Sequence, residues 1–191
     1  MHTTAHSTAY SLIRPNAWWL ELPLLLGFNL LLVACAYIVF TVPFSPVPIT
    51  GQTFGVLLVA MALGRVRGTA VVTAYLIEGI AGLPVFAGGS AGPAVLAGPT
   101  AGYLLGFVVA AWVVGSLADR GWDKNFGLSV AAMTIGTAVI FIGGLAWLTQ
   151  FVPLEGLLTA GLIPFAPGAL IKIGIASVIL PSIWRFIRND R

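Results

Sequence analysis

The stretch SVAAMTIGTAVIFIGGLAW (129–147) decides the fold class. Its apolar residues do not alternate with polar ones, so it lacks the pattern of a strand in a membrane barrel. The runs FVVAAWVVGSLA (107–118) and LIKIGIASVILPSIW (170–184) are likewise apolar on every face. These segments predict helices in lipid, because lipid offers no hydrogen-bond partner to an open strand edge.

The composition of the whole chain agrees with this prediction. Only 8% of the 191 residues are charged and 59% are hydrophobic, whereas an ordinary soluble domain has about 25% charged residues. The mean hydropathy is +1.01. The composition therefore disfavours a soluble enzyme, a nucleic-acid-binding protein and a disordered chain. A disulfide-stabilised scaffold is also disfavoured, because the chain has a single cysteine.

We expect an all-α integral membrane protein that forms a single transmembrane domain over residues 1–191. Residues 1–17 form a cytoplasmic tail in this prediction, and GRVRG (64–68) links two helices into a hairpin. The six predicted transmembrane helices cover about residues 18–41, 51–63, 68–80, 99–117, 128–149 and 167–186.

Lysine and arginine residues are segregated among the predicted loops. With the N-terminus in the cytoplasm, the inner side carries Arg14, Arg65, Arg67, Arg120, Lys124, Arg185, Arg188 and Arg191. The outer loops, at about 42–50, 81–98 and 150–166, contain no Lys or Arg. The positive-inside rule therefore places both termini in the cytoplasm. The same asymmetry explains the pI of about 9.4 without a nucleic-acid partner.

The three outer loops are rich in proline and glycine, yet they are apolar. They read VPFSPVPIT (42–50), AGLPVFAGGSAGPAVLAGP (81–99) and FVPLEGLLTAGLIPFAP (151–167). Irregular apolar backbone near a membrane is tolerated where it is buried in protein or lines a cavity. We expect a packed lid over a small-molecule cavity, the alternative being loops that only cap the helix ends. The run GGSAG (88–92) lacks the Lys and Ser/Thr that complete a phosphate-binding loop.

Lys172 lies near the start of the sixth predicted helix, in GALIKIG, with no other charge in that run. It lies about 8 Å of helix rise beyond Pro167, and a cation at this depth marks a functional site by default. We therefore expect it to bind an anionic ligand, most simply a carboxylate. The alternative is a lysine whose ammonium reaches the membrane surface.

Other polar and aromatic residues at the outer helix ends are further candidates. Glu78 lies near the outer end of the third predicted helix, and it would pair with Lys172, accept hydrogen bonds from a ligand or reach the membrane surface. Phe86 and Tyr103 are expected to pack on the apolar part of a ligand. The polar candidates to orient a ligand are Gln52, Thr53, Ser90, Thr100 and Tyr103.

The segment LVAC (32–35) resembles a lipoprotein cleavage box, which would make Cys35 a lipidated terminus. Glu21 and Pro23 interrupt the preceding apolar stretch, and removal of that stretch would disturb the charge pattern. We therefore favour an unprocessed helix.

The sequence gives little support for catalysis. Both histidines, His2 and His6, lie in the N-terminal tail, and no His/Cys/Asp cluster has metal-ligand spacing. The chain also has no nucleotide-binding motif. We expect no catalytic residue, no metal and no cofactor. The prediction is a protein that captures a substrate while a partner supplies the energy.

Four motifs together resemble the BioY family, the biotin-specific S components of energy-coupling-factor (ECF) transporters. They are PFSPVPITGQT (43–53), GLPVFAGG (82–89), GPTAGYLLGF (98–107) and PFAPGALIKI (164–173). The resemblance implies a six-helix S-component fold in the bacterial cytoplasmic membrane and biotin as the transported ligand. It also implies membrane lipid around the helices and, as partners, one transmembrane T component and two cytoplasmic ATPases.

The resemblance also implies site residues, with two departures. Lys172 would bind the valerate carboxylate, and polar groups of the second outer loop, where Gly88 and Gly89 lie, would meet the ureido ring. The family usually has an acid three positions before the lysine, where this chain has Ala169, and a polar residue that often follows PVF falls here at Gly88 or its neighbour. We expect substitutes for these groups, or a reduced affinity. The substitutes are Glu78, Gln52, Ser90 or backbone carbonyls of the glycine-rich loop.

Three other functions compete with this interpretation. A stand-alone oligomeric biotin carrier would work without ATPases. A membrane-embedded enzyme would need a nucleophile, an acid/base pair or a metal at depth in the membrane, and the sequence offers only Lys172 and Glu78 there. A structural membrane adaptor would bind no ligand.

Overall fold

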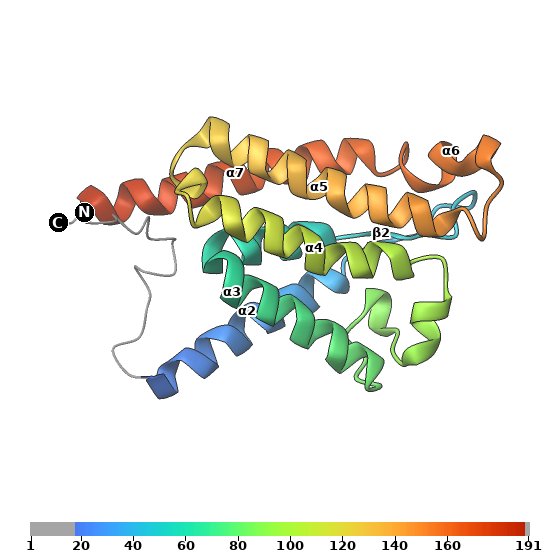
Figure 1. Ribbon diagram of the computed structural model, residues 1–191, viewed down its shortest axis with the longest axis horizontal. Helices are drawn as coiled ribbons and strands as arrows, with labels where there is room; N and C mark the ends of the chain where they lie inside the picture. Colours follow the sequence, from blue (N-terminus) through green and yellow to red (C-terminus); the bar gives the residue numbers. More distant parts are fainter. Residues whose placement is uncertain (1–17, 190–191) are drawn as a thin grey trace.

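The computed structural model describes residues 18–189, which are almost entirely helical (Figure 1). A short turn of 3₁₀ helix, Trp18–Leu20, leads into α2 (Glu21–Ala36). The strands β1 (Val39–Phe40) and β2 (Ile49–Thr50) follow. The later helices are α3 (Gln52–Ile80), α4 (Ala101–Ala118), α5 (Phe126–Leu148), α6 (Leu157–Gly161) and α7 (Ala166–Asn189). Short 3₁₀ turns lie at Ala87–Gly89, Pro93–Ala97, Trp122–Lys124 and Leu154–Gly156.

The helix α3 is bent into a hairpin at Gly64. This residue has φ 77° and ψ −175°, a conformation that favours glycine because it carries no Cβ. A Cβ built on Gly68 would lie 2.8 Å from the Cα of Ala60, whereas eight residues of straight helix span about 12 Å. The hairpin predicted from GRVRG is thus present, but its second arm begins at Arg65, not at Gly68.

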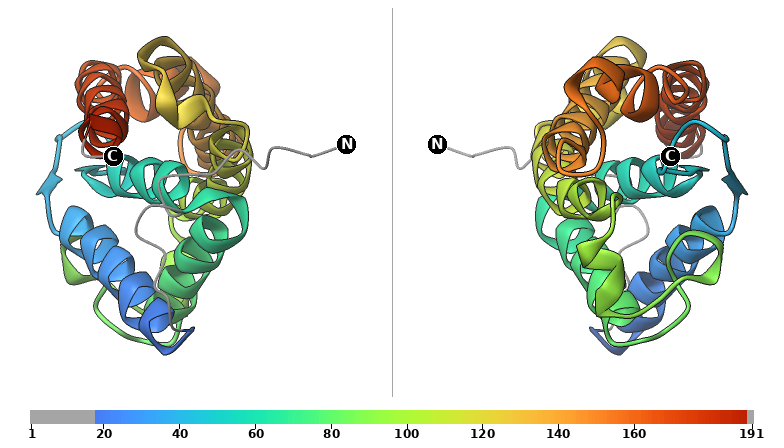
Figure 2. Two further views of the ribbon diagram at one scale, coloured as in Figure 1. Left: turned by 90° about the vertical axis from the view of Figure 1, so that its left-hand side faces the viewer. Right: turned by 90° about the vertical axis from the view of Figure 1, so that its right-hand side faces the viewer.

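The first arm of α3 forms the centre of the bundle. The end views show α2, the second arm of α3, α4, α5 and α7 arranged around it (Figure 2). Nine of the ten residues from Gly55 to Gly64 are buried. The helices approach closely where glycines replace side chains: a Cβ on Gly102 of α4 would lie 2.4 Å from the carbonyl oxygen of Gly143 in α5. Small residues at such contacts are typical of helix packing in membranes.

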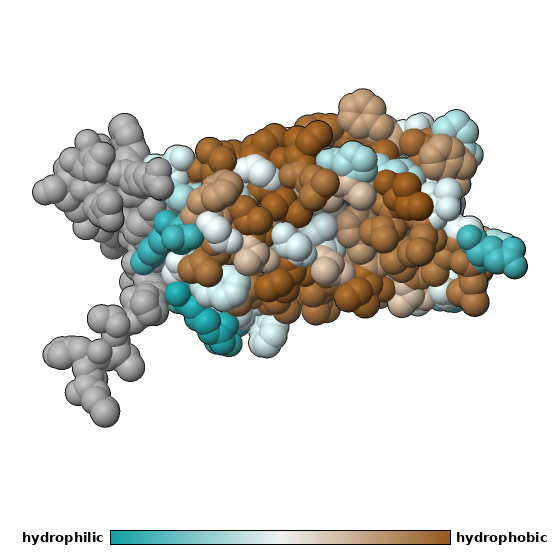
Figure 3. Space-filling model, turned by 90° about the horizontal axis from the view of Figure 1, so that it is seen from above, coloured by the Kyte–Doolittle hydropathy of each residue, from teal (hydrophilic) through white to brown (hydrophobic). Residues whose placement is uncertain are grey.

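Four helical stretches among residues 18–189 are long and apolar enough to cross a membrane. They are Gln52–Ile80, Ala101–Ala118, Phe126–Leu148 and Leu154–Ser182. The helix α2 is apolar but has only 16 residues. Figure 3 shows a broad apolar surface between more polar ends. The predicted all-helical fold is confirmed. Four such stretches are fewer than six separate spans, because the hairpin counts as one stretch and α2 is too short to be counted.

The first predicted helix is too long at its C-terminal end. The helix α2 ends at Ala36, not near Thr41. Beyond it, Val39 pairs with Thr50 and Phe40 with Ile49 in a short antiparallel ladder. These residues are extended because their backbone groups bond across the loop and not along a helix. Cys35 lies inside α2 and is buried, and a Cβ on Gly55 would lie 3.3 Å from its Sγ.

The loops sort to two opposite ends of the bundle (Figure 1). One end holds the β1–β2 loop, residues 81–98 and α6, which carry the three predicted outer loops. The other end holds the Gly64 bend and the α4–α5 connection, with Arg65, Arg67, Arg120 and Lys124. The predicted tail at 1–17, with Arg14, and also Arg191 lie outside the described residues, as do the side chains of Trp184, Arg185 and Arg188.

Candidate ligand-binding site

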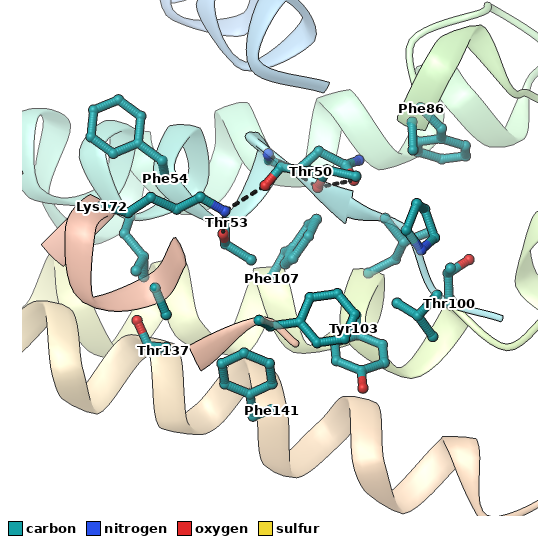
Figure 4. A pocket seen from close by; sticks show the side chains of 18 of the residues that line it. Thr50, Thr53, Phe54, Phe86, Thr100, Tyr103, Phe107, Thr137, Phe141 and Lys172 are labelled. Carbon is teal, nitrogen blue, oxygen red and sulfur yellow. Dashed lines mark hydrogen bonds between the residues drawn. The ribbon is translucent and has the colours of Figure 1, made fainter. Parts of the chain in front are cut away.

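A pocket lies among α3, α4, α5 and α7 and reaches toward the end that carries the predicted outer loops (Figure 4). Its lining is mostly apolar and includes the aromatic rings of Phe54, Phe86, Phe107, Phe141 and Phe165. The polar lining residues are Thr50, Gln52, Thr53, Ser90, Thr100, Tyr103, Thr137 and Lys172. A mostly apolar cavity with a few convergent polar groups is the usual form of a small-molecule site.

Lys172 supplies the charge of this pocket. Its Nζ donates to the carbonyl oxygen of Thr50 at 2.5 Å and to the Oγ1 of Thr53 at 3.0 Å (Figure 4). The lining residues that the structure describes include no Asp, Glu, Arg or His. The ammonium is therefore solvated by neutral oxygens, and an anionic ligand would gain a charge-assisted hydrogen bond by replacing one of them.

Gln52 and Tyr75 brace the backbone that holds Lys172. The Nε2 of Gln52 donates to the hydroxyl of Tyr75 at 2.6 Å, and its Oε1 accepts from the Oγ1 of Thr50 at 3.0 Å. Thr50 is thus held by its side chain, while its carbonyl oxygen accepts from Lys172. Both ends of the Gln52 amide are occupied within the protein.

Aromatic rings form one wall of the pocket. The ring centroid of Tyr103 lies 6.3 Å from that of Phe141 and 6.4 Å from that of Phe165. The hydroxyl of Tyr103 donates to the carbonyl oxygen of Gly161 in α6 at 2.8 Å. The ring can therefore pack on a ligand while the hydroxyl attaches the third outer loop to α4.

Phe86 closes another side of the pocket from the second outer loop. It is only 1% exposed, and its ring meets that of Tyr75 edge to face at 5.5 Å. Gly79 makes room for it, since a Cβ there would lie 2.1 Å from the Cζ of Phe86. This contact fixes the loop against α3.

The outer loops are tied to one another and to the helices. The Oγ of Ser45 in the first loop donates to the carbonyl oxygen of Ala160 in α6 at 2.7 Å. The hydroxyl of Tyr37 donates to the carbonyl oxygen of Pro84 in the second loop at 2.6 Å. The first bond joins the first and third loops, and the second attaches the second loop to the end of α2. Residues from each loop, such as Val47, Phe86 and Phe165, line the pocket. The loops thus do more than cap helix ends.

Seven of the ten predicted site residues line this pocket, and three do not. Lys172, Tyr103, Phe86, Gln52, Thr53, Ser90 and Thr100 are among the lining residues. Glu78 does not pair with Lys172, because its Oε1 accepts from the Nδ2 of Asn29 in α2 at 3.1 Å. Gly88 and Gly89 form a tight turn beside the pocket, with φ of 62° and 82°.

Sequence reasoning missed several lining residues. Thr137 lies within the apolar run 129–147. The sequence does not show whether a threonine hydroxyl in such a run faces a pocket or forms a hydrogen bond to the backbone of its own helix. Phe141 and Phe165 also line the pocket. The chain contains 21 Phe, Tyr and Trp residues in all, and the sequence does not distinguish these two from the others. Ala169 also lines the pocket, three residues before Lys172, so it leaves that turn of α7 without a carboxylate.

The fold and the pocket together define a class: a multi-pass membrane protein with a small-molecule site beneath loops at one end. The sequence model of the BioY family matches residues 11–189. The chain belongs to the BioY family, as the four sequence motifs predict.

Comparisons with individual proteins agree. The chain is 39% identical to "Biotin transporter BioY" of Thermotoga maritima over 153 residues, which are 80% of this chain and 88% of that protein. It is 37% identical to the "Biotin transporter BioY" of Rhizobium etli over 145 residues, 71% of this chain and 77% of the other. A crystal structure of the S component for biotin from an ECF-type ABC transporter matches with a TM-score of 0.78 and 26% identity, covering 90% of this chain and 94% of the other. These relatives are transport proteins, not enzymes.

Proposed function

We propose that this chain is the biotin-binding uptake component, the S component, of an ATP-driven ECF transporter. The observation that carries the proposal is the pocket beneath the outer loops, in which Lys172 is the one charged lining residue among those the structure describes. Biotin carries one carboxylate on an otherwise neutral body, so a single cation in an apolar pocket suits it. Family membership and the names of the relatives support the same ligand.

In this proposal the chain crosses the bacterial cytoplasmic membrane six times, with both termini in the cytoplasm. The pocket then opens toward the outer face, where the loops contain no Lys or Arg, and Arg65, Arg67, Arg120 and Lys124 face the cytoplasm. This arrangement follows the positive-inside rule. It places the site where a vitamin arrives from outside.

The carboxylate of biotin would take the place of neutral oxygens around Lys172. The Nζ would exchange its bond to Thr50 or Thr53 for a charge-assisted bond to the ligand. The bicyclic ring and the aliphatic chain of biotin would pack on Tyr103, Phe86 and the neighbouring phenylalanines. Most of the affinity would then come from apolar burial, with the ion pair setting the orientation.

The two ureido N–H groups of biotin need acceptors other than a carboxylate at position 169. Glu78 and Gln52 already have protein partners. The remaining candidates are the hydroxyls of Ser90, Thr100 and Thr137, all of which line the pocket, and backbone carbonyls of the second outer loop. We propose that these oxygens bind the ureido group.

Energy for release into the cell would come from a T component and two ATPases. Two measurements test this function. Calorimetry on the purified chain in detergent should give one biotin bound per chain. Uptake of labelled biotin should require co-expression of the T component and the ATPases. Absence of binding would overturn the ligand, while uptake by the chain alone would favour the stand-alone carrier.

A further inference from the structure

A second concave site lies on the outside of the bundle, between the second arm of α3 and α4. It is lined by Arg65, Thr69 and Trp112, with Ala70 and Ala74 among the lining residues along α3. The alanines are exposed and small, whereas Trp112 beside them is 53% exposed. The small side chains thus form the floor of a groove and the larger one forms a wall.

Arg65 lies at one end of this groove, and its guanidinium is available to bind a ligand. Among the described residues, that group has no hydrogen-bond or ion-pair partner, although the backbone N–H of Arg65 donates to the Oδ2 of Asp119 at 3.2 Å. Its neighbours differ, because Arg67 pairs with Glu21 at 2.6 Å and Arg120 donates to the carbonyl oxygen of Ser116 at 3.0 Å. The groove therefore ends at a cation free to bind an anion.

Thr69 is a second polar residue that lines the groove. The Oγ1 of Thr69 is buried and has no hydrogen-bond partner among the described residues. It follows Arg65 by four residues, so the two lie on one face of the helix. Thr69 therefore lies one helical turn from Arg65, at the depth of the ester region of a lipid whose phosphate contacts Arg65.

The length of the groove matches one leaflet of a bilayer. Its lining along α3 runs from Arg65 to Ile77, and twelve residues of helix rise about 18 Å. One leaflet of hydrocarbon is about half of the 30 Å core. A groove with a cation at its headgroup end and apolar walls over this length fits one phospholipid better than it fits a second protein.

We propose that this groove binds one phospholipid with an anionic headgroup, its phosphate on Arg65 and one acyl chain along Ala70 and Ala74. The site is separate from the ligand pocket, since no residue lines both. Anionic lipids are abundant in the cytoplasmic leaflet, which agrees with the orientation in which Arg65 faces the cytoplasm. Lipid binding itself does not depend on that orientation or on biotin.

Native mass spectrometry of the delipidated full chain tests this proposal. Dioleoyl phosphatidylglycerol and dioleoyl phosphatidylcholine are added separately at equal concentrations, and dissociation constants are measured. We expect one phosphatidylglycerol per chain, bound about tenfold more tightly than phosphatidylcholine, because the choline cation of phosphatidylcholine offsets the attraction between its phosphate and Arg65. Equal binding of the two lipids would overturn the proposal.

Two variants, each with a matched control, locate the site. Arg65→Gln should remove the tenfold preference for phosphatidylglycerol, whereas Arg120→Gln, which removes a charge at the same end outside the groove, should keep it. Ala74→Leu fills the floor and should weaken both lipids, while Ala34→Leu at an exposed position of α2 should weaken neither. Equal effects of the two arginine variants would show nonspecific attraction and contradict the proposal.

A soluble competitor separates lipid binding from simple anion binding. Glycerol phosphate carries a phosphate group without acyl chains. We expect no displacement of phosphatidylglycerol by an equal concentration of it, because the apolar groove contributes to the affinity. Displacement at equal concentration would mean that Arg65 binds phosphate alone, and the proposal would fail.

Discussion

Lys172 and Glu78 are two ionisable residues in apolar predicted helices, and they have opposite surroundings. Lys172 points into the pocket and is held by a backbone carbonyl and a threonine hydroxyl. Glu78 faces α2 and accepts a hydrogen bond from Asn29, which is only 7% exposed. An ionisable side chain within a membrane helix costs free energy wherever it lies. The comparison shows that the partner of the side chain decides whether it binds a ligand or joins two helices.

The largest expected effect is on Lys172. Lys172→Met keeps an unbranched side chain that is one atom shorter and removes its charge, so biotin should lose a charge-assisted bond of about 1.5–3 kcal/mol, or about 10- to 150-fold in affinity. Calorimetry in detergent measures this loss. Lys124→Met, a lysine outside the pocket, is the control and should bind as the unaltered chain does. An unchanged affinity for biotin in Lys172→Met would contradict the assignment of Lys172, and not Glu78, to the ligand.

Gly79 is next to Glu78 in α3, but it contacts the ring of Phe86, which lines the pocket. Gly79→Ala would bring a Cβ to 2.1 Å from the Phe86 ring, and such overpacking costs about 1–3 kcal/mol. The melting temperature and the affinity for biotin should both fall. Gly27→Ala in α2 is a control because no atom lies within 4 Å of its Cβ position. Normal biotin binding by Gly79→Ala would show that biotin binding does not depend on the packing of Phe86 against Gly79.

Tyr103 allows the ring and the hydroxyl to be separated. Tyr103→Phe keeps the aromatic wall and removes the bond to Gly161, which should lower stability by about 1 kcal/mol. Because the hydroxyl holds the cover, biotin should dissociate several-fold faster while its association rate changes little. Stopped-flow binding and thermal unfolding measure the two effects. A loss of affinity as large as that of Lys172→Met would instead assign the hydroxyl to the ligand.

The smallest expected effect on binding is at Glu78. Glu78→Gln should leave the affinity for biotin within about twofold, since the side chain faces Asn29 and not the pocket. Its effect should be on stability, because a charge-assisted bond becomes a neutral one. Thermal unfolding of Glu78→Gln, Asn29→Leu and the double variant should show non-additive changes, as contacting residues do. A large loss of biotin binding in Glu78→Gln would place Glu78 in the site.

Much of the fold follows from local sequence. The apolar runs predict the helices, and GRVRG predicts the hairpin of α3. The end of α2 is different, because β1 pairs with a strand ten residues further along the chain, and that pairing removes the last predicted turn. Local propensity does not contain this long-range contact.

The candidate site is predictable where single residues are unusual for their surroundings. Lys172 is an isolated cation in an apolar helix, and Phe86 and Tyr103 lie in the motifs of apolar loops or helix ends. Thr137 and Phe141 look like ordinary members of an apolar helix. The partner of Glu78 is 49 residues away in the sequence, so only the packing of α2 on α3 separates its role from that of Lys172.

The central claim is that Lys172 binds the carboxylate of biotin. The most direct measurement compares biotin with biotinamide, which keeps the ring and the chain but is neutral. The unaltered chain should bind biotin about tenfold or more tightly than biotinamide, and Lys172→Met should bind both with similar affinity, since only the charge pair separates them. If Lys172→Met keeps the full preference for biotin, the carboxylate is bound elsewhere and the account is contradicted.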